Sequence, residues 1–142
     1  MIVYAESSAV LAWLLGEPAA PAVRHILAGA ERVVASTLTP LECSRALARG
    51  VTLGTLDHDA AREAVRLLAH ATQGWALLEM TGTPVERAAR AFPVEPVRTL
   101  DALQLSAALE FHAALGMITM LSLDERIRDN AVALGMETGP EA

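Results

Sequence analysis

The stretch MIVYAESSAVLAWLL, residues 1–15, shows the arrangement of a strand followed by a helix that recurs along the whole chain. Residues 2–4 form a short apolar run that predicts a buried strand, and residues 9–15 have the apolar content of a helix packed against it. Glu6 and two serines lie between them. The order is therefore strand, acidic turn, helix, which is how a parallel α/β unit begins.

The same alternation of strand and helix continues along the chain. Further strands are predicted at residues 32–35, 75–80, 117–121 and 136–138, and helices at 21–29, between 36 and 54, and at 57–72, 83–91, 100–115 and 124–134. The strands are continuous apolar runs, which is typical of strands covered on both faces. We therefore predict a single domain over residues 1–142, with a three-layer α/β/α fold around a parallel sheet of four to five strands.

Two of these helices carry specific expectations about burial. The helix at 100–115 is apolar nearly all round, which predicts that it is buried. The helix at 57–72 is predicted to turn one apolar face to the core, formed by Ala61, Val65, Leu68 and Ala69.

Composition excludes several classes of protein. Hydrophobic residues make up 53% of the chain and charged residues 20%, which is too apolar for a disordered chain, yet no apolar run is long enough to cross a bilayer. The first residues include an acid and no positive leader, so we expect a cytoplasmic protein without a membrane anchor. The lone cysteine, Cys43, excludes an internal disulfide and a thiolate-rich zinc cluster, and we expect it to be buried.

The charge pattern narrows the chemistry. All 11 basic residues are arginine, and the absence of lysine excludes P-loop phosphate binding and Schiff-base catalysis. A net charge of −6 argues against binding nucleic acid by overall charge. That objection weakens if the acids gather around divalent ions, which cancel part of their field.

Four acids lie near the ends of predicted strands and helices: Glu6, Glu42, Asp101 and Asp124. Ligands of α/β sheets collect at the carboxyl ends of strands, so these carboxylates could meet in one pocket. Magnesium prefers such hard oxygen ligands, and it activates water for attack on a phosphate. Taken singly, each acid is explained as well by helix capping or by pairing with an arginine on an exposed face. Their joint placement is what favours a metal site.

The segments around these acids resemble the motifs of the PIN-domain family, in that family's order. They are Ile2 to Ala9, Leu41 to Leu47, Leu100 to Ala108, and Ser122 to Arg126 with the following Leu134-Gly135-Met136. Together they span nearly the whole chain. The resemblance implies a PIN-like fold and the activity of VapC-like toxins, a magnesium-dependent endoribonuclease that cleaves RNA phosphodiester bonds, with manganese as a substitute ion.

The resemblance also implies roles for individual residues and partners. Glu6, Glu42, Asp101 and Asp124 are expected to be catalytic. Of these, Glu6, Asp101 and Asp124 are the expected metal ligands. Supporting hydroxyls are expected from Ser7 and Ser122. From their position in the sequence, Arg45 and Arg49 could contact the RNA substrate, although exposed helix faces explain these arginines equally well. The expected partners are RNA, a cognate antitoxin protein and a second copy of the chain in a homodimer.

Glu6 departs from the family pattern, which has aspartate at that position. The side chain is one methylene longer, so a bound ion would have to shift or the side chain fold back. This leaves open an alternative, a PIN-like protein with weak or lost catalysis that acts mainly by binding its antitoxin or RNA. A third interpretation, a phospho-accepting receiver domain, is disfavoured because the chain has no lysine.

Overall fold

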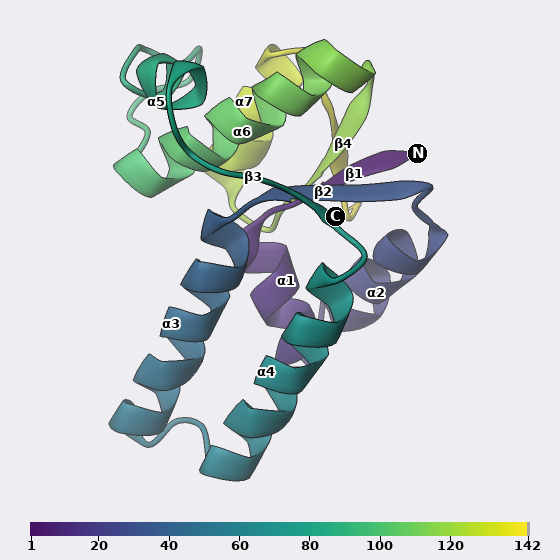
Figure 1. Ribbon diagram of the computed structural model, residues 1–142, viewed down its shortest axis with the longest axis vertical. Coiled ribbons are helices and arrows are strands. Elements are labelled where there is room, and N and C mark those ends of the chain that lie inside the picture. Colours follow the sequence, from purple (N-terminus) through teal and green to yellow (C-terminus); the bar gives the residue numbers. More distant parts are fainter. Residues whose placement is uncertain (142) are drawn as a thin grey trace.

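The computed structural model describes residues 1–141 and shows a five-stranded parallel sheet between two layers of helices (Figure 1). The strands are β1 (Ile2–Ala5), β2 (Arg32–Ser36), β3 (Ala76–Leu78), β4 (Ile118–Leu121) and β5 (Glu137–Gly139). The helices are α1 (Ser7–Leu14), α2 (Ala20–Gly29), α3 (Leu38–Leu53), α4 (His58–Thr72), α5 (Thr83–Ala88), α6 (Thr99–Leu115) and α7 (Glu125–Ala133). The three-layer fold predicted from the sequence is confirmed.

The strand order is β3-β2-β1-β4-β5, with every neighbouring pair parallel. β1 is central because it pairs with β2 on one side and β4 on the other, and Val3 is in register with both Val33 and Thr119. The chain reverses its direction of travel across the sheet at β1, so the loops after β1 and β4 diverge. This is the switch point at which open α/β sheets bind ligands.

Side chains of the central strand alternate between two hydrophobic layers. Tyr4 points to the layer of α6 and α7 and packs with Leu105 and Met120. Val3 and Ala5 point to the opposite layer, which holds α1 to α4. Cys43 is fully buried in that layer, as expected. Burial on both faces explains why the strands are continuous apolar runs.

The face predicted for the helix at 57–72 is confirmed at Leu68 and half-buried at Ala61, but it is wrong at Val65 and Ala69. α4 buries Ala64 and Leu68, whereas Val65 is 46% exposed and Ala69 is exposed as well. The reason is that α3 and α4 form a hairpin that projects beyond the sheet (Figure 1), so α4 packs against helices rather than a broad sheet face. The helix at 100–115 was expected to be buried along its length. It is mostly buried between Ala102 and Ala108, but Leu100 at its start is 48% exposed. Among residues 1–141, no helix combines the length and apolarity needed to cross a membrane.

Candidate active site

All four acids singled out in the sequence line one pocket with a volume of ≈ 300 Å³. Its walls are formed by Glu6, Ser7, Ser8, Leu11, Glu42, Cys43, Ala46, Arg49, Asp101 and Asp124. Topology explains this convergence. Helices that connect parallel strands run back against them, so α1, α3, α6 and α7 all begin at the carboxyl edge of the sheet. Of the two arginines expected to contact substrate, Arg49 lines this pocket, whereas Arg45 is exposed outside it.

Glu6 is held in place by three hydrogen bonds to one of its oxygens. It is the N-cap of α1 and is 4% exposed. Its Oε2 accepts from the Ser8 amide at 3.1 Å, from the Ser122 hydroxyl at 2.7 Å and from the Ser8 hydroxyl. Burial raises the pKa of Glu6; the serine hydrogen bonds oppose this shift, and the charge of Glu42 adds to it. Glu6 therefore caps a helix and lines the pocket at once.

Ser8, rather than Ser7, supports Glu6. The Ser8 hydroxyl also accepts from the Leu123 amide at 2.9 Å and lies 3.2 Å from the Ser122 hydroxyl. Ser122 in turn accepts from the Asp124 amide at 3.1 Å. These contacts fasten the loop after β1 to the loop after β4. The sequence analysis named Ser7 and Ser122 as the supporting hydroxyls and left out Ser8, which of the two serines after Glu6 is the one that contacts it.

Ser7 supports a different acid, Glu42, together with a residue that the sequence analysis missed. The Ser7 hydroxyl donates to Glu42 Oε1 at 2.9 Å, and the Gln104 amide donates to the same oxygen at 2.7 Å. Gln104 is 1% exposed, although it lies on the most apolar helix. A buried amide in such a helix requires polar partners, and that requirement was the signal that could have identified it.

The other side of Gln104 is anchored in the core. Its Oε1 accepts from the Tyr4 hydroxyl at 2.5 Å, and its Nε2 lies 3.2 Å from the Thr39 hydroxyl. Thr39 also donates to the Ala5 carbonyl at 2.9 Å. Burial, above all, raises the pKa of Tyr4 well above its ordinary value of 10.0, so its hydroxyl remains a donor. A continuous buried network thus connects the sheet to the Glu42 carboxylate.

We expect Gln104→Met to lower the free energy of unfolding by about 2–4 kcal/mol, because similar volume is retained while buried polar partners lose their hydrogen bonds. Urea unfolding at neutral pH measures this change. The matched control is Gln73→Met, since Gln73 is exposed at the end of α4. Equal stability of the two variants would show that the network contributes nothing to the fold.

Asp101 and Asp124 form the outer part of the site. Asp124 caps α7, and its Oδ1 accepts from the Ile127 amide at 3.0 Å. Burial raises the pKa of Asp101, the charges of Asp124 and Glu42 raise it further, and Arg98 opposes them. The salt bridges found over residues 1–141 lie elsewhere on the surface, at Glu31, Asp59 and Glu63. None of the four acids of the pocket forms a salt bridge within that part of the chain.

The donor set fits a hydrated divalent cation. All the charged donors are carboxylates and the neighbouring groups are hydroxyls, which are the hard oxygen ligands that magnesium and manganese take. Within the described part of the chain, no three acidic, histidine or cysteine side chains form a compact cage. Magnesium usually retains several waters and needs only one or two direct carboxylates, so an open arrangement suits it.

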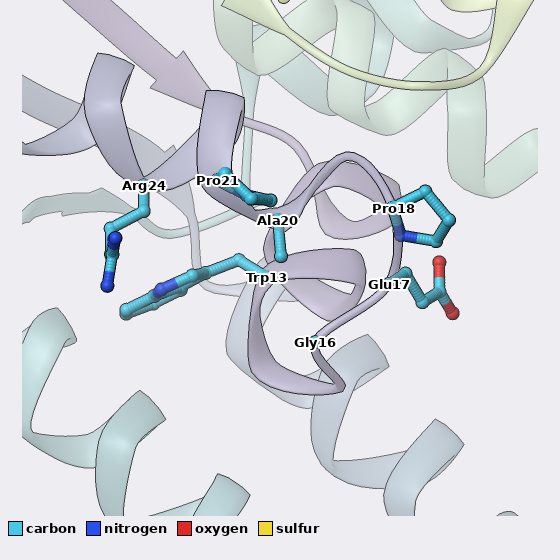
Figure 2. A pocket seen from close by; sticks show the side chains of 7 residues that line it. All are labelled: Trp13, Gly16, Glu17, Pro18, Ala20, Pro21 and Arg24. Carbon is cyan, nitrogen blue, oxygen red and sulfur yellow. The ribbon is translucent and has the colours of Figure 1, made fainter.

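A larger hollow lies away from the acids, with a volume of ≈ 470 Å³ (Figure 2). It is lined by Trp13, Gly16, Glu17, Pro18, Ala20, Pro21 and Arg24, at the turn between α1 and α2. It shares no residue with the acidic pocket, and Glu17 is the only acid in its wall. The larger hollow therefore lacks the cluster of four acids that the smaller pocket contains.

Comparison with known proteins shows which family the chain resembles along most of its length. Residues 3–133 match the sequence profile of the PIN domain. The chain is also 35% identical over 136 residues to a protein named Ribonuclease VapC46 from Mycobacterium tuberculosis (strain ATCC 25618 / H37Rv). That alignment covers 94% of this chain and 93% of the relative, so the similarity extends over nearly the full length of both proteins.

Proposed function

Because the chain belongs to the PIN-domain family, and within it to the VapC-like proteins, we propose that it is a magnesium-dependent endoribonuclease and the toxin of a toxin–antitoxin pair. The observation that supports this most is the convergence of Glu6, Glu42, Asp101 and Asp124 on one pocket without ion-pair partners. Carboxylates so close to one another, with their charge uncompensated, favour a bound cation and are poorly explained as helix caps alone.

Glu6, Asp101 and Asp124 would hold the metal in this proposal, one or two of them directly and the rest through its bound waters. Bound magnesium, or manganese in its place, would lower the pKa of a coordinated water and offset charge on the phosphate. Ser8 and Ser122 fix the orientation of Glu6 through its Oε2. These hydrogen bonds would keep the metal-binding carboxylates in a fixed position, since a small misplacement of reacting groups lowers the reaction rate strongly.

We assign proton handling to Glu42. Its Oε1 is fixed by Ser7 and Gln104, and the carboxylate borders the same pocket. It is placed to accept a proton from the water that attacks phosphorus, while the bond from phosphorus to the leaving sugar oxygen breaks and that oxygen takes up a proton. Arg49, on the pocket wall, would bind a phosphate oxygen of the RNA.

The partners follow from the same proposal: an RNA substrate, a cognate antitoxin and a second copy of the chain, in the cytoplasm. Apolar side chains exposed on the α3–α4 hairpin support a protein partner there, among them Leu53 at 68% and Val65 at 46% exposed. A single small domain gains nothing from leaving such groups in water. Light scattering of the protein alone, and with the antitoxin encoded beside it, tests both associations.

We expect purified protein to cleave cellular RNA in magnesium or manganese and to lose at least about 10²-fold of that rate in a chelator, because the carboxylates cannot stabilise a phosphate without the ion. Gel analysis of total RNA, with readdition of each metal, measures this. Cleavage that persists unchanged in the chelator would refute the metal-dependent mechanism.

A second function has one observation in its favour. Glu6 Oε2 already accepts three hydrogen bonds, which leaves fewer lone pairs for a metal. A PIN-like protein with weak or lost catalysis, acting mainly by binding its antitoxin or RNA, would show binding without metal-dependent cleavage in the same experiment.

A further inference from the structure

A second hollow adjoins the acidic pocket on its outer side. It has a volume of ≈ 330 Å³ and is lined by Pro96, Arg98, Asp101, Asp124 and Arg126. Asp101 and Asp124 belong to both hollows, so these two aspartates form the boundary between them. The inner hollow contains the carboxylates and Arg49, and the outer hollow contains two arginines.

Neither arginine of the outer hollow is neutralised there. The ion pairs found in residues 1–141 involve other groups, so no carboxylate oxygen in that part of the chain forms a salt bridge with Arg98 or Arg126. Arg126 is oriented by a single bond, from its Nη1 to the Glu95 carbonyl at 3.2 Å. Its other N–H groups remain available. Arg98 is exposed and lines the same hollow as Asp101 and Asp124, which places it beside the boundary.

Two unpaired arginines in one hollow are suited to a phosphate. The guanidinium group presents several N–H donors in a planar fork that matches phosphate oxygens. If their role were only to neutralise the aspartates, direct ion pairs would be expected. Local positive charge is also what the protein needs, because a net charge of −6 and an acidic site repel an RNA backbone.

Resting on the ribonuclease function above, we propose that Arg98 and Arg126 bind a backbone phosphate of the RNA substrate beside the one that is cleaved. The RNA then crosses the boundary formed by Asp101 and Asp124, with Arg49 on the inner side and Arg98 and Arg126 on the outer side.

The test is single-turnover cleavage of a short labelled single-stranded RNA at saturating magnesium, over a series of protein and sodium chloride concentrations. We expect Arg98→Ala and Arg126→Ala each to raise the half-saturating protein concentration roughly tenfold, with little change in maximal rate. The slope of log affinity against log salt should become shallower by about 0.7 for each phosphate that the variant no longer neutralises. The matched control is Arg32→Ala, since Arg32 is exposed at the amino end of β2, far from the site.

Charge-preserving variants test whether the alanine variants lose RNA affinity only because they misfold. Arg98→Lys and Arg126→Lys should keep the parental salt slope while losing part of the affinity, because lysine retains the charge but not the planar fork. Alanine variants that match Arg32→Ala in affinity and slope would overturn the inference while the parent still cleaves RNA. So would variants that weaken only antitoxin binding, or that alter only the magnesium requirement. A parent that neither binds nor cleaves RNA would overturn the proposed function as well.

Discussion

Asp101→Asn is expected to reduce RNA cleavage by roughly 10²–10⁴-fold while making the protein more stable at neutral pH. The loss follows from removing a metal ligand. The gain follows from electrostatics, because burial raises the pKa of Asp101 and the charges of Asp124 and Glu42 raise it further. An asparagine at this position is neutral at every pH, so it avoids both the desolvation and the repulsion.

The pH dependence of this gain has a definite sign. A raised pKa means that the folded state binds the proton more tightly than the unfolded state, whose Asp101 titrates near 3.8. The free energy of unfolding therefore falls as pH rises from that value through the raised pKa, and it stays lower at neutral pH. The advantage of Asp101→Asn should be present at pH 7 and should disappear in acid, where the parent is protonated.

Thermal unfolding at neutral and acidic pH, with and without magnesium, measures both effects. Magnesium should stabilise the parent, because it binds only the folded state, and should stabilise Asp101→Asn less. Asp129→Asn is the matched control, since Asp129 is exposed on α7 and lines neither hollow. A variant that cleaves RNA like the parent, or whose stability shows no pH-dependent gain, would remove Asp101 from the metal site.

The pattern of the sequence was sufficient to predict the fold. Apolar runs without alternation indicated strands covered on both faces, and their alternation with helices indicated parallel connections. Some element boundaries differ from the prediction. The strand expected at 75–80 is reduced to β3 (Ala76–Leu78), and the helix expected at 83–91 ends at Ala88. Short edge elements depend on tertiary contacts that local composition does not record.

The positions of the four acids were predictable because topology alone brings their segments to one edge of the sheet. Their hydrogen-bond partners were not. Ser7 and Ser8 are adjacent in sequence, yet one contacts Glu42 and the other contacts Glu6, because successive residues of a helix point in different directions. Gln104 was missed because its role depends on Tyr4 and Glu42, which are distant in sequence.

The arginines, too, could not be assigned to the site from the local sequence alone. Arg45 and Arg49 are one helical turn apart and have the same side chain, so nothing in their local pattern separates them, but only Arg49 reaches the pocket. The outer pair, Arg98 and Arg126, comes from segments that meet only in the fold. Sequence motifs can therefore locate acids that the topology brings to one edge of the sheet, whereas grouping the arginines requires knowing which exposed side chains share a hollow.

Glu6→Asp separates the two roles of Glu6, since aspartate is a good N-cap but has a shorter reach. We expect α1 to remain capped and the free energy of unfolding to fall modestly, because the buried hydrogen bond from Ser122 is weakened. Cleavage should fall by about 10²-fold, because the carboxylate retracts from the Ser122 hydroxyl, which now lies 2.7 Å from Oε2. Glu6→Gln should lose cleavage as well, through loss of the negative charge.

Cleavage as a function of magnesium concentration distinguishes the roles that Glu6 could have. A fall in both rate and magnesium affinity in Glu6→Asp would show that Ser8 and Ser122 have adapted to the longer acid. A rise in both would show instead that glutamate is a compromised ligand and that aspartate restores the usual family arrangement. Either shift in metal dependence places Glu6 at the ion. If Glu6→Asp and Glu6→Gln both cleave like the parent at limiting magnesium, then Glu6 is only a helix cap, and the ion must be held by Asp101 and Asp124 without it.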